Sequence, residues 1–330
     1  MRRRDFITLV GSSAIARPVT ARAQQGQRVR RIGVLMSISE TNPAAQVNVT
    51  AFAAGLQEQG WIEGRNVQFD YRWAKGQPDL VRKFAAELVA AQPDIIVSYG
   101  APNAVALRDA TRTIPIVFLY VSDPIGMGVV ESMRRPGGNI TGFATFEPSL
   151  GGKWLELLKE LSPGIRRSAI VYNPDTAPNA PAFIGTAQKA GSALGVAIVV
   201  TAVRDDAVIN QEIAEFARAP GGSIMLLPDQ FTADRPHVLV AAAIRHHLPL
   251  ISPFRAIPTA GGLASYGIDA DQHNRKAAVY VDRILRGENP SDLPIQQPTK
   301  FELVINLRNA KALGLTITPM LLARADEVIE

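Results

Sequence analysis

The sequence predicts an α/β protein built from two Rossmann-like lobes with parallel sheets, joined by a multi-strand hinge. Three observations predict this fold. One segment carries a complete strand, helix and strand, the pattern of the first half of the chain recurs in the second, and several segments cross between the halves. A chain of 330 residues is long enough for two such domains.

Residues 93–124 hold the strand, helix and strand. Asp94–Ser98 and Ile116–Tyr120 are short apolar runs rich in β-branched residues, so both are predicted as strands buried on two faces. Between them, Ala101–Ala110 has apolar residues at helical spacing and Pro102 near its first turn, where a missing N–H is harmless. This order predicts a parallel sheet, whose ligands bind beyond the carboxyl ends of the strands.

The other elements of the first half follow from the same periodicities. Apolar and alternating runs predict strands, and apolar residues three or four positions apart predict helices. In chain order these elements are a strand at Arg31–Met36, a helix at Asn42–Gly60, a strand at Asn66–Trp73, a helix through Leu80, Phe84 and Leu88, and a strand at Ile140–Phe143 after the turn residues 136–139.

The pattern then starts again. The matched pairs are RRIGVL at 30–35 with RRSAIV at 166–171, Gly60 with Gly195, and Ile-Pro-Ile at 114–116 with Leu-Pro-Leu at 248–250. The members of each pair are separated by 134 to 136 residues. Such nearly equal spacing predicts two lobes of similar design.

Three segments are predicted to cross between the lobes. They are the stretch 142–148 that leads into a helix at 152–161, the step from a strand at 263–266 to a helix at 269–286, and the linker 290–298 before a last strand at 301–305. We therefore expect lobe 1 to comprise residues 28–144 and 267–297, and lobe 2 residues 145–266 and 298–330. Several crossings form a hinge, so the lobes can close on a ligand.

The first 23 residues predict an export signal. Arg2–Arg4 precede an apolar stretch at Phe6–Ile15, and Ala21-Arg22-Ala23 supplies the small residues of a cleavage site. The segment 3–7 also resembles a twin-arginine signal, while the general export route and a frayed basic arm are the alternatives. Five Arg and one Asp in residues 1–23 account for +4 of the formal net charge of +5. The rest of the chain therefore lacks the basic excess that nucleic-acid binding needs.

Six segments carry a resemblance to a known family over nearly the whole chain. They are RRRDFITLVG, ARAQQ, GWIEGRNVQFDYRWAKGQPD, IPIVFLYVSDPIGMGVVESMRRPGGNITG, VYNPD and PTKFELVINLRNAKALGLTITPMLLARADEVIE. With them the chain resembles the extracytoplasmic solute-binding proteins of ABC transporters, in the type I periplasmic binding protein group related to tryptophan and tyrosine transporter components. The segment 115–142 is the most specific.

This resemblance implies the type I periplasmic binding protein fold and a periplasmic receptor that is not an enzyme. Such a receptor captures a small-molecule solute, here an amino acid or an aromatic compound, in the cleft between its lobes. It then presents the solute to the permease of an ABC importer at the membrane. We also expect a monomer without a cofactor, cleaved near Ala23.

The ligand-binding residues predicted in lobe 1 follow its strands: Ser37, Ser39, Asn42, Tyr99, Gly100, Ala101, Ser122 and Asp123. Hydroxyls and helix N-terminal N–H groups suit a carboxylate, and Asp123 suits an ammonium group. Local roles are the alternative, because Ser39 and Asn42 are good helix N-caps and Asp123-Pro124 is typical of a turn.

The residues predicted in lobe 2 occupy the matching loops: Tyr172, Asn173, Asp229, Phe231, Ser252, Phe254, Tyr266 and Asp269. Aromatic rings at strand ends could stack on a planar solute, each favourable pair contributing about 0.5 to 1.5 kcal/mol. The alternatives are that these rings cover the core and that Asn173-Pro174-Asp175 is simply a turn.

Enzyme signatures are missing from the sequence. It has no G-x-G-x-x-G after a strand, no P-loop and no G-x-S-x-G elbow. The histidines, at 237, 246, 247 and 273, lack metal-binding spacing, and we expect them at the solvated surface. No catalytic residue, metal site or cofactor is predicted, and the absence of Cys excludes thiolate ligands.

Two other function classes share this architecture. A periplasmic ligand sensor would use the same cleft but bind the ectodomain of a receptor in place of a permease. A two-lobed α/β enzyme would need Asp123 and Asp229 as acid and base, with separated pKa values and within reach of one substrate atom.

Overall fold

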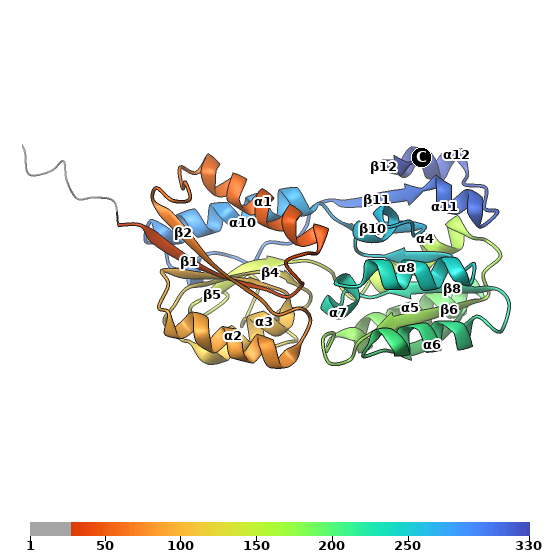
Figure 1. Ribbon diagram of the computed structural model, residues 1–330, viewed down its shortest axis with the longest axis horizontal. Coiled ribbons are helices and arrows are strands. Elements are labelled where there is room, and N and C mark those ends of the chain that lie inside the picture. The colour runs from red at the N-terminus through yellow and green to blue at the C-terminus, as the bar shows by residue number, and fades with distance from the viewer. Residues whose placement is uncertain (1–27) are drawn as a thin grey trace, which may run out of the picture.

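A computed structural model describes residues 28–330 and shows two α/β lobes side by side (Figure 1). This confirms the predicted fold class. The predicted export signal and its cleavage site lie outside the described residues. Among residues 28–330 there is no helix with the length and apolar character needed to cross a membrane.

The sheet of lobe 1 has the strand order β2-β1-β3-β4-β5, and every neighbouring pair is parallel. Its strands are β1 (Arg30–Met36), β2 (Val67–Trp73), β3 (Ile95–Tyr99), β4 (Ile116–Val121) and β5 (Ile140–Ala144). Helices α1 (Pro43–Glu58) and α10 (Ala270–Leu285) cover one face, and α2 (Pro78–Ala90) and α3 (Ala101–Ala110) cover the other. Because both faces are covered, β3 is wholly buried, as its continuous apolar run predicts.

The sheet of lobe 2 has the order β12-β11-β10-β9-β8-β6-β7. Its strands are β6 (Arg167–Tyr172), β7 (Ala197–Ala202), β8 (Gly222–Leu226), β9 (Leu250–Ser252), β10 (Ala264–Ile268), β11 (Phe301–Asn306) and β12 (Glu327–Ile329). The run β7-β6-β8-β9-β10 repeats the order of the first sheet with parallel pairs, which explains the internal repeat of the sequence. Strand β11 adds antiparallel to β10.

Helices cover both faces of this second sheet as well. They are α4 (Leu150–Leu161) and α5 (Ala180–Leu194) on one face and α6 (Asp206–Phe216) and α8 (Pro236–Arg245) on the other. Two short helices, α7 (Gln230–Ala233) and α9 (Ala256–Thr259), follow β8 and β9. A 3-10 turn (Pro290–Asp292) precedes β11, and α11 (Leu307–Ala312) and α12 (Pro319–Arg324) lie near the C-terminus.

The chain passes between the two sheets three times: after β5, between β10 and α10, and before β11. Helix α10 follows a strand of lobe 2 but packs against α1 in lobe 1 (Figure 1). The two helices approach closely because α1 carries Gly55, where a Cβ would lie 2.8 Å from the Cβ of Ala278. The division into lobes at residues 144, 266 and 297 stays an interpretation of these crossings.

Candidate functional site

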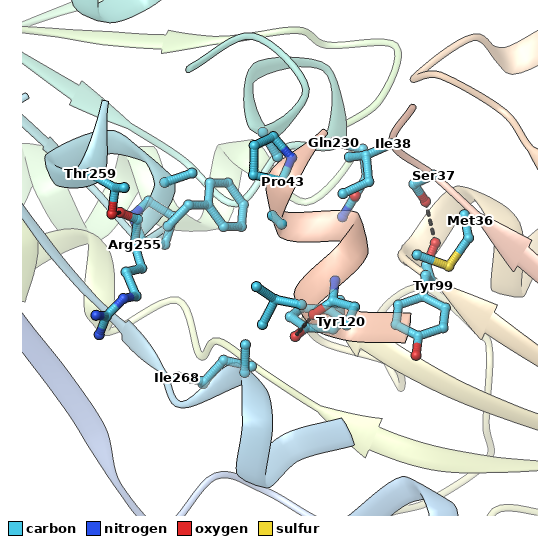
Figure 2. A pocket seen from close by; sticks show the side chains of 18 of the residues that line it. Met36, Ser37, Ile38, Pro43, Tyr99, Tyr120, Gln230, Arg255, Thr259 and Ile268 are labelled. Carbon is cyan, nitrogen blue, oxygen red and sulfur yellow. Dashed lines mark hydrogen bonds between the residues drawn. The ribbon is translucent and has the colours of Figure 1, made fainter. Parts of the chain in front are cut away.

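A cavity of about 270 Å³ lies between the two lobes (Figure 2). Lobe 1 contributes the loop after β1, the start of α1 and the ends of β3 and β4, and lobe 2 contributes α7, the loop after β9 with α9, and the end of β10. These are mainly the carboxyl ends of parallel strands, where such sheets bind ligands. The volume lies just below the range of about 300 to 1,000 Å³ found for ligand pockets, so the cavity is matched to a small solute.

Four aromatic side chains line this cavity: Tyr99, Tyr120, Phe146 and Phe254. The rings of Tyr99 and Tyr120 lie 5.9 Å apart at an interplanar angle of 24°, and Figure 2 shows them side by side. Tyr120 lies near the end of β4, where its φ is 58° and the pairing with β5 shifts in register. The cavity therefore offers flat apolar faces to a planar solute.

A buried hydrogen-bond network holds the two tyrosines. The Tyr99 hydroxyl donates to Asn274 Oδ1 (2.7 Å), and the Tyr120 hydroxyl donates to Asn48 Oδ1 (2.9 Å). Asn274 Nδ2 in turn donates to Asn48 Oδ1 (3.0 Å) and to the carbonyl of Ala270 (2.7 Å). Burial raises the pKa of both phenols above its usual value, so both stay neutral and able to donate at neutral pH.

At Gly100 the backbone of lobe 1 comes close to Gln230 of α7 in lobe 2. The φ of Gly100 is 92°, and a Cβ there would lie 2.5 Å from Ser37 Oγ and 3.0 Å from Cδ of Gln230. Ser37 Oγ donates to the carbonyl of Tyr99. A larger residue at 100 would therefore push apart side chains that line the cavity.

Beside the cavity, a carboxylate joins the lobes directly. Asp234 Oδ1 at the end of α7 accepts from Ser39 N (2.9 Å), Ser39 Oγ (2.8 Å) and Asn42 Nδ2 (3.1 Å). Asn42 Nδ2 also donates to the carbonyl of Ala233 (3.1 Å). We call Ser39, Asn42 and Asp234 the interlobe latch, because these bonds form only when the lobes are close.

Within residues 28–330, Arg255 is the only charged residue that lines the cavity. It lies just before α9, and its guanidinium forms an ion pair with Glu327 of β12. No acidic side chain lines the cavity in the same range. An anionic group on a ligand therefore has a partner available, whereas a cationic group would depend on neutral acceptors.

The structure distributes the predicted lobe 1 residues over several places. Ser37 and Tyr99 line the cavity, with Gly100 directly beside them, and Ser39 and Asn42 form the latch. Ala101 and Ser122 line a smaller cavity of about 20 Å³ that shares Tyr120, Phe146, Gln230 and Phe254 with the larger one.

Asp123 lies apart from both of these cavities. It lines a third cavity, of about 380 Å³, beside the hinge segment 144–150 and residues 297–301. Its carboxylate accepts from the backbone N–H of Gly126 (3.0 Å), the local turn that was the alternative to a ligand contact. Of the four aromatic side chains of the large cavity, only Phe146 also lines this third one, so Asp123 is separated from Tyr99, Tyr120 and Phe254.

Of the predicted lobe 2 residues, only Phe254 lines the large cavity. The others take part in packing or capping: Tyr172 packs on the core, Asn173 donates to Asp229, Asp229 caps α7, Phe231 is buried, Ser252 Oγ accepts from Phe254 N, Tyr266 stacks on Phe301, and Asp269 caps α10. Burial raises the pKa of the Asp229 carboxyl, although four hydrogen bonds favour its charged form. Asp229 and Asp123 thus occupy separate surroundings.

Sequence reasoning missed several lining residues: Met36, Ile38, Asn48, Tyr120, Phe146, Arg255, Thr259 and Ile268. For Asn48 a signal was present, because it lies four residues before Phe52 and eight before Leu56 on the buried stripe of α1. A polar side chain in a buried stripe is expected to have a hydrogen-bond partner inside the protein.

The expected surface position is wrong for His273. It is 7% exposed, and its ring lies 5.0 Å from the ring of Tyr120 and 5.7 Å from that of Phe143. Burial, with a smaller effect of the Lys276 charge, lowers the pKa of the His273 imidazole to about 3. The residue is buried because it extends the inward stripe of Ala277, Val281 and Leu285 by one turn of α10. No group of three or more potential metal ligands occurs in the described part of the chain.

A family model described as ABC transporter substrate binding protein matches residues 30–329. A tyrosine-binding protein of Clostridioides difficile is 25% identical over 292 residues, which cover 88% of this chain and 82% of the relative.

Solved structures are similar over 91% of this chain. A conserved domain protein of Vibrio cholerae is 31% identical, with a TM-score of 0.84 and 100% of its chain covered. An ABC domain in complex with L-Trp from Streptococcus pneumonia is 27% identical, with a TM-score of 0.82 and 99% covered. A ligand-free, open substrate-binding protein of Clostridium difficile is 25% identical, with a TM-score of 0.66 and 99% covered. At similar identity, this chain is thus more similar in shape to the L-Trp complex than to the open structure.

Proposed function

The chain belongs to the ABC transporter substrate-binding protein family, and on this premise we propose that it captures an aromatic amino acid between its lobes for an ABC importer. The observation that carries this proposal is the cavity at the lobe interface, with four aromatic side chains drawn from lobe 1, the hinge and lobe 2. The tyrosine-binding relative and the L-Trp complex support the same ligand class.

Each part of such a ligand has a partner in the cavity. The aromatic ring lies against Tyr99, Tyr120 and Phe254, and stacking adds to the burial of its apolar surface. The carboxylate pairs with Arg255, which exchanges Glu327 for the ligand. The ammonium group is held by a neutral acceptor, and the side-chain amide of Gln230 on α7 lines the cavity.

Closure completes the site. The latch joins the lobes beside the cavity. A ligand that contacts both lobes favours the same closed arrangement, so the latch and the ligand stabilise it together. The similarity in shape to the L-Trp complex supports this interpretation.

Isothermal titration calorimetry of the purified protein tests the ligand class. We expect L-Tyr, L-Trp or L-Phe to bind about 100-fold more tightly than L-Leu or L-Glu, because only aromatic rings use the stacked faces. Binding of sugars or non-aromatic amino acids in preference to all three aromatic ones would overturn the proposal.

The variant Arg255→Gln tests the role of the cation. It should weaken binding of the amino acid about tenfold, since one charge-assisted hydrogen bond is lost, and leave binding of the corresponding amino-acid amide unchanged. An equal loss for the acid and its amide would place the carboxylate elsewhere.

We also propose that the protein works outside the cytoplasmic membrane, as a monomer and without turnover of its ligand. Family membership supports an extracytoplasmic receptor that partners a permease. Residues 1–23 carry the pattern of an export signal. N-terminal sequencing of the exported protein should give Gln24 as the first residue, and light scattering should give the mass of one chain. Recovery of the ligand chemically unchanged checks the absence of turnover.

A further inference from the structure

The orientation of the Asn48 amide is fixed by a chain of hydrogen bonds that begins at a backbone carbonyl. The carbonyl of Ala270 can only accept, so the atom of Asn274 that lies 2.7 Å from it is Nδ2, a donor. This donor lies 3.0 Å from Asn48, whose facing atom must accept and is therefore Oδ1. The Tyr120 hydroxyl donates to the same oxygen at 2.9 Å, and Figure 2 shows Tyr120 at the cavity.

The nitrogen of this amide is left for a ligand. Asn48 lines the cavity and is 8% exposed, and within residues 28–330 its Nδ2 donates no hydrogen bond. This nitrogen is not one of the fully buried polar atoms that lack a partner, so it is accessible to solvent. Since Oδ1 is bound to the network, Nδ2 is the part of the amide that faces the cavity.

We propose that Asn48 selects an aromatic amino acid whose ring carries a hydrogen-bond acceptor, a phenol in preference to an indole or an unsubstituted phenyl ring. This inference rests on the proposed function and narrows it. A phenol oxygen accepts from Nδ2, whereas an indole N–H is only a donor and a phenyl ring is neither. With those rings the Asn48 donor loses water without gaining a partner, which penalises their binding.

The orientation of the ligand follows from the two ends of the cavity. Tyr99 and Tyr120 lie on the lobe 1 wall, and Arg255 lies on the lobe 2 wall (Figure 2). Asn48 lines the cavity from α1 and so belongs to the lobe 1 wall. With its carboxylate at Arg255, the ligand directs its ring towards Tyr99 and Tyr120, and the far edge of the ring towards Asn48. A donor held in one orientation in this way rejects analogues that lack the acceptor, as sites built to bind a substrate hydroxyl do.

Titration of the wild-type protein with L-Tyr, L-Phe and L-Trp is the first test. L-Tyr should bind at least about tenfold more tightly than L-Phe and L-Trp, because one hydrogen bond forms and one unpaired donor is avoided. Equal binding of L-Tyr and L-Phe would overturn the inference while leaving the proposed function intact. Absence of binding by all three would overturn the proposed function itself.

Two variants separate selection from a merely structural role. Asn48→Leu should bring the Kd values of L-Tyr and L-Phe to within about threefold of each other, since both rings then meet an apolar side chain. Equal loss for both ligands would show that Asn48 contacts the common α-amino acid group, or only supports the wall, and would overturn the inference. Gln46→Leu, on an exposed position of the same helix, is the matched control and should change neither Kd.

If the Leu variant fails to fold, Asn48→Asp tests the same inference. Its Oδ1 still accepts from Tyr120 and Asn274, while Oδ2 replaces the donor with an acceptor. The indole N–H of L-Trp can then donate to Oδ2, so the affinity for L-Trp relative to L-Phe should rise about fivefold or more. An unchanged ratio would overturn the inference.

Discussion

The two walls of the cavity differ in how their side chains are held. On the lobe 1 wall, Tyr99, Tyr120 and Asn48 are tied to one another through Asn274, which is fully buried. On the lobe 2 wall, the lining residues other than Ile268 lie on or beside the four-residue helices α7 and α9, and the side chain of Arg255 is 55% exposed. Lobe 1 therefore presents a fixed surface, whereas lobe 2 presents groups that can adjust.

This difference suggests a division of labour. Fixed polar groups can distinguish ligands, because their donors and acceptors cannot turn to suit a wrong partner. Short helices and a half-exposed cation suit the lobe that closes, since they can exchange the partners of the open state for a ligand.

Asn274→Leu should remove the support of the lobe 1 wall. It leaves the Tyr99 hydroxyl without its acceptor and removes one of the two donors to Asn48 Oδ1, so the buried network loses its centre. The free energy of unfolding should fall by about 3 kcal/mol, since each unsatisfied buried group costs about 1 to 3 kcal/mol. Urea denaturation measures this, with Asn210→Leu on α6 as the control. A loss no larger than that of the control would remove the contrast between the walls.

His273 should make the stability of the lobe 1 side depend on pH. Its native pKa of about 3 lies below the value of 6.5 for an unperturbed imidazole, so the unfolded chain takes up a proton that the native protein does not. The stability is complete above pH 6.5 and falls by about 1.4 kcal/mol per pH unit between about pH 6 and 4.

The variant His273→Phe isolates this contribution from that of the carboxylates. The difference in unfolding free energy between wild type and variant should change by about 1.4 kcal/mol per pH unit over the same range. His237→Gln, at an exposed position of α8, serves as control and should follow the wild type. Parallel curves for wild type and His273→Phe would contradict the buried neutral state.

Asp234→Ala should weaken closure without changing selectivity. It removes the carboxylate that accepts from Ser39 and Asn42, so the closed fraction falls and every ligand loses affinity by the same factor, about tenfold. Small-angle X-ray scattering of the unliganded variant should show a larger radius of gyration. Asp206→Ala is the control, because Asp206 pairs with Arg235 within lobe 2. A ligand-dependent loss would show that Asp234 takes part in recognition.

Phe254→Ala should have the smallest effect. It removes one ring from the adjustable wall, and the affinity for the aromatic ligand should fall about fivefold with little change in stability. Phe84→Ala, a partly buried position on α2 away from the cavity, is the control and should leave the affinity unchanged. Unchanged affinity in Phe254→Ala would mean that the ring of the ligand does not contact lobe 2.

Part of this site could be deduced from the chain alone. Parallel strands expose their carboxyl ends on one edge of a sheet, which is why the strand-end rule found Ser37, Tyr99 and Phe254. The helical residues Asn48 and His273 were missed, although their spacing of four from buried neighbours places them on inward faces. Local capping explains why Asp229 and Asp269, equally close to strand ends, turn their carboxylates to nearby backbone N–H groups.

The sequence by itself determined the two lobes, the succession of strands and helices along each and the edge of each sheet that meets the cleft, because periodicity and repeats are local properties of the chain. Only the tertiary structure decided which polar groups pair across the cleft. Asn48 and Asn274 are 226 residues apart, and Asn42 and Asp234 are 192 apart. A hydrogen bond depends on the distance and direction between two atoms, and these are defined only once α10 has returned to lobe 1 and α7 has met the loop after β1.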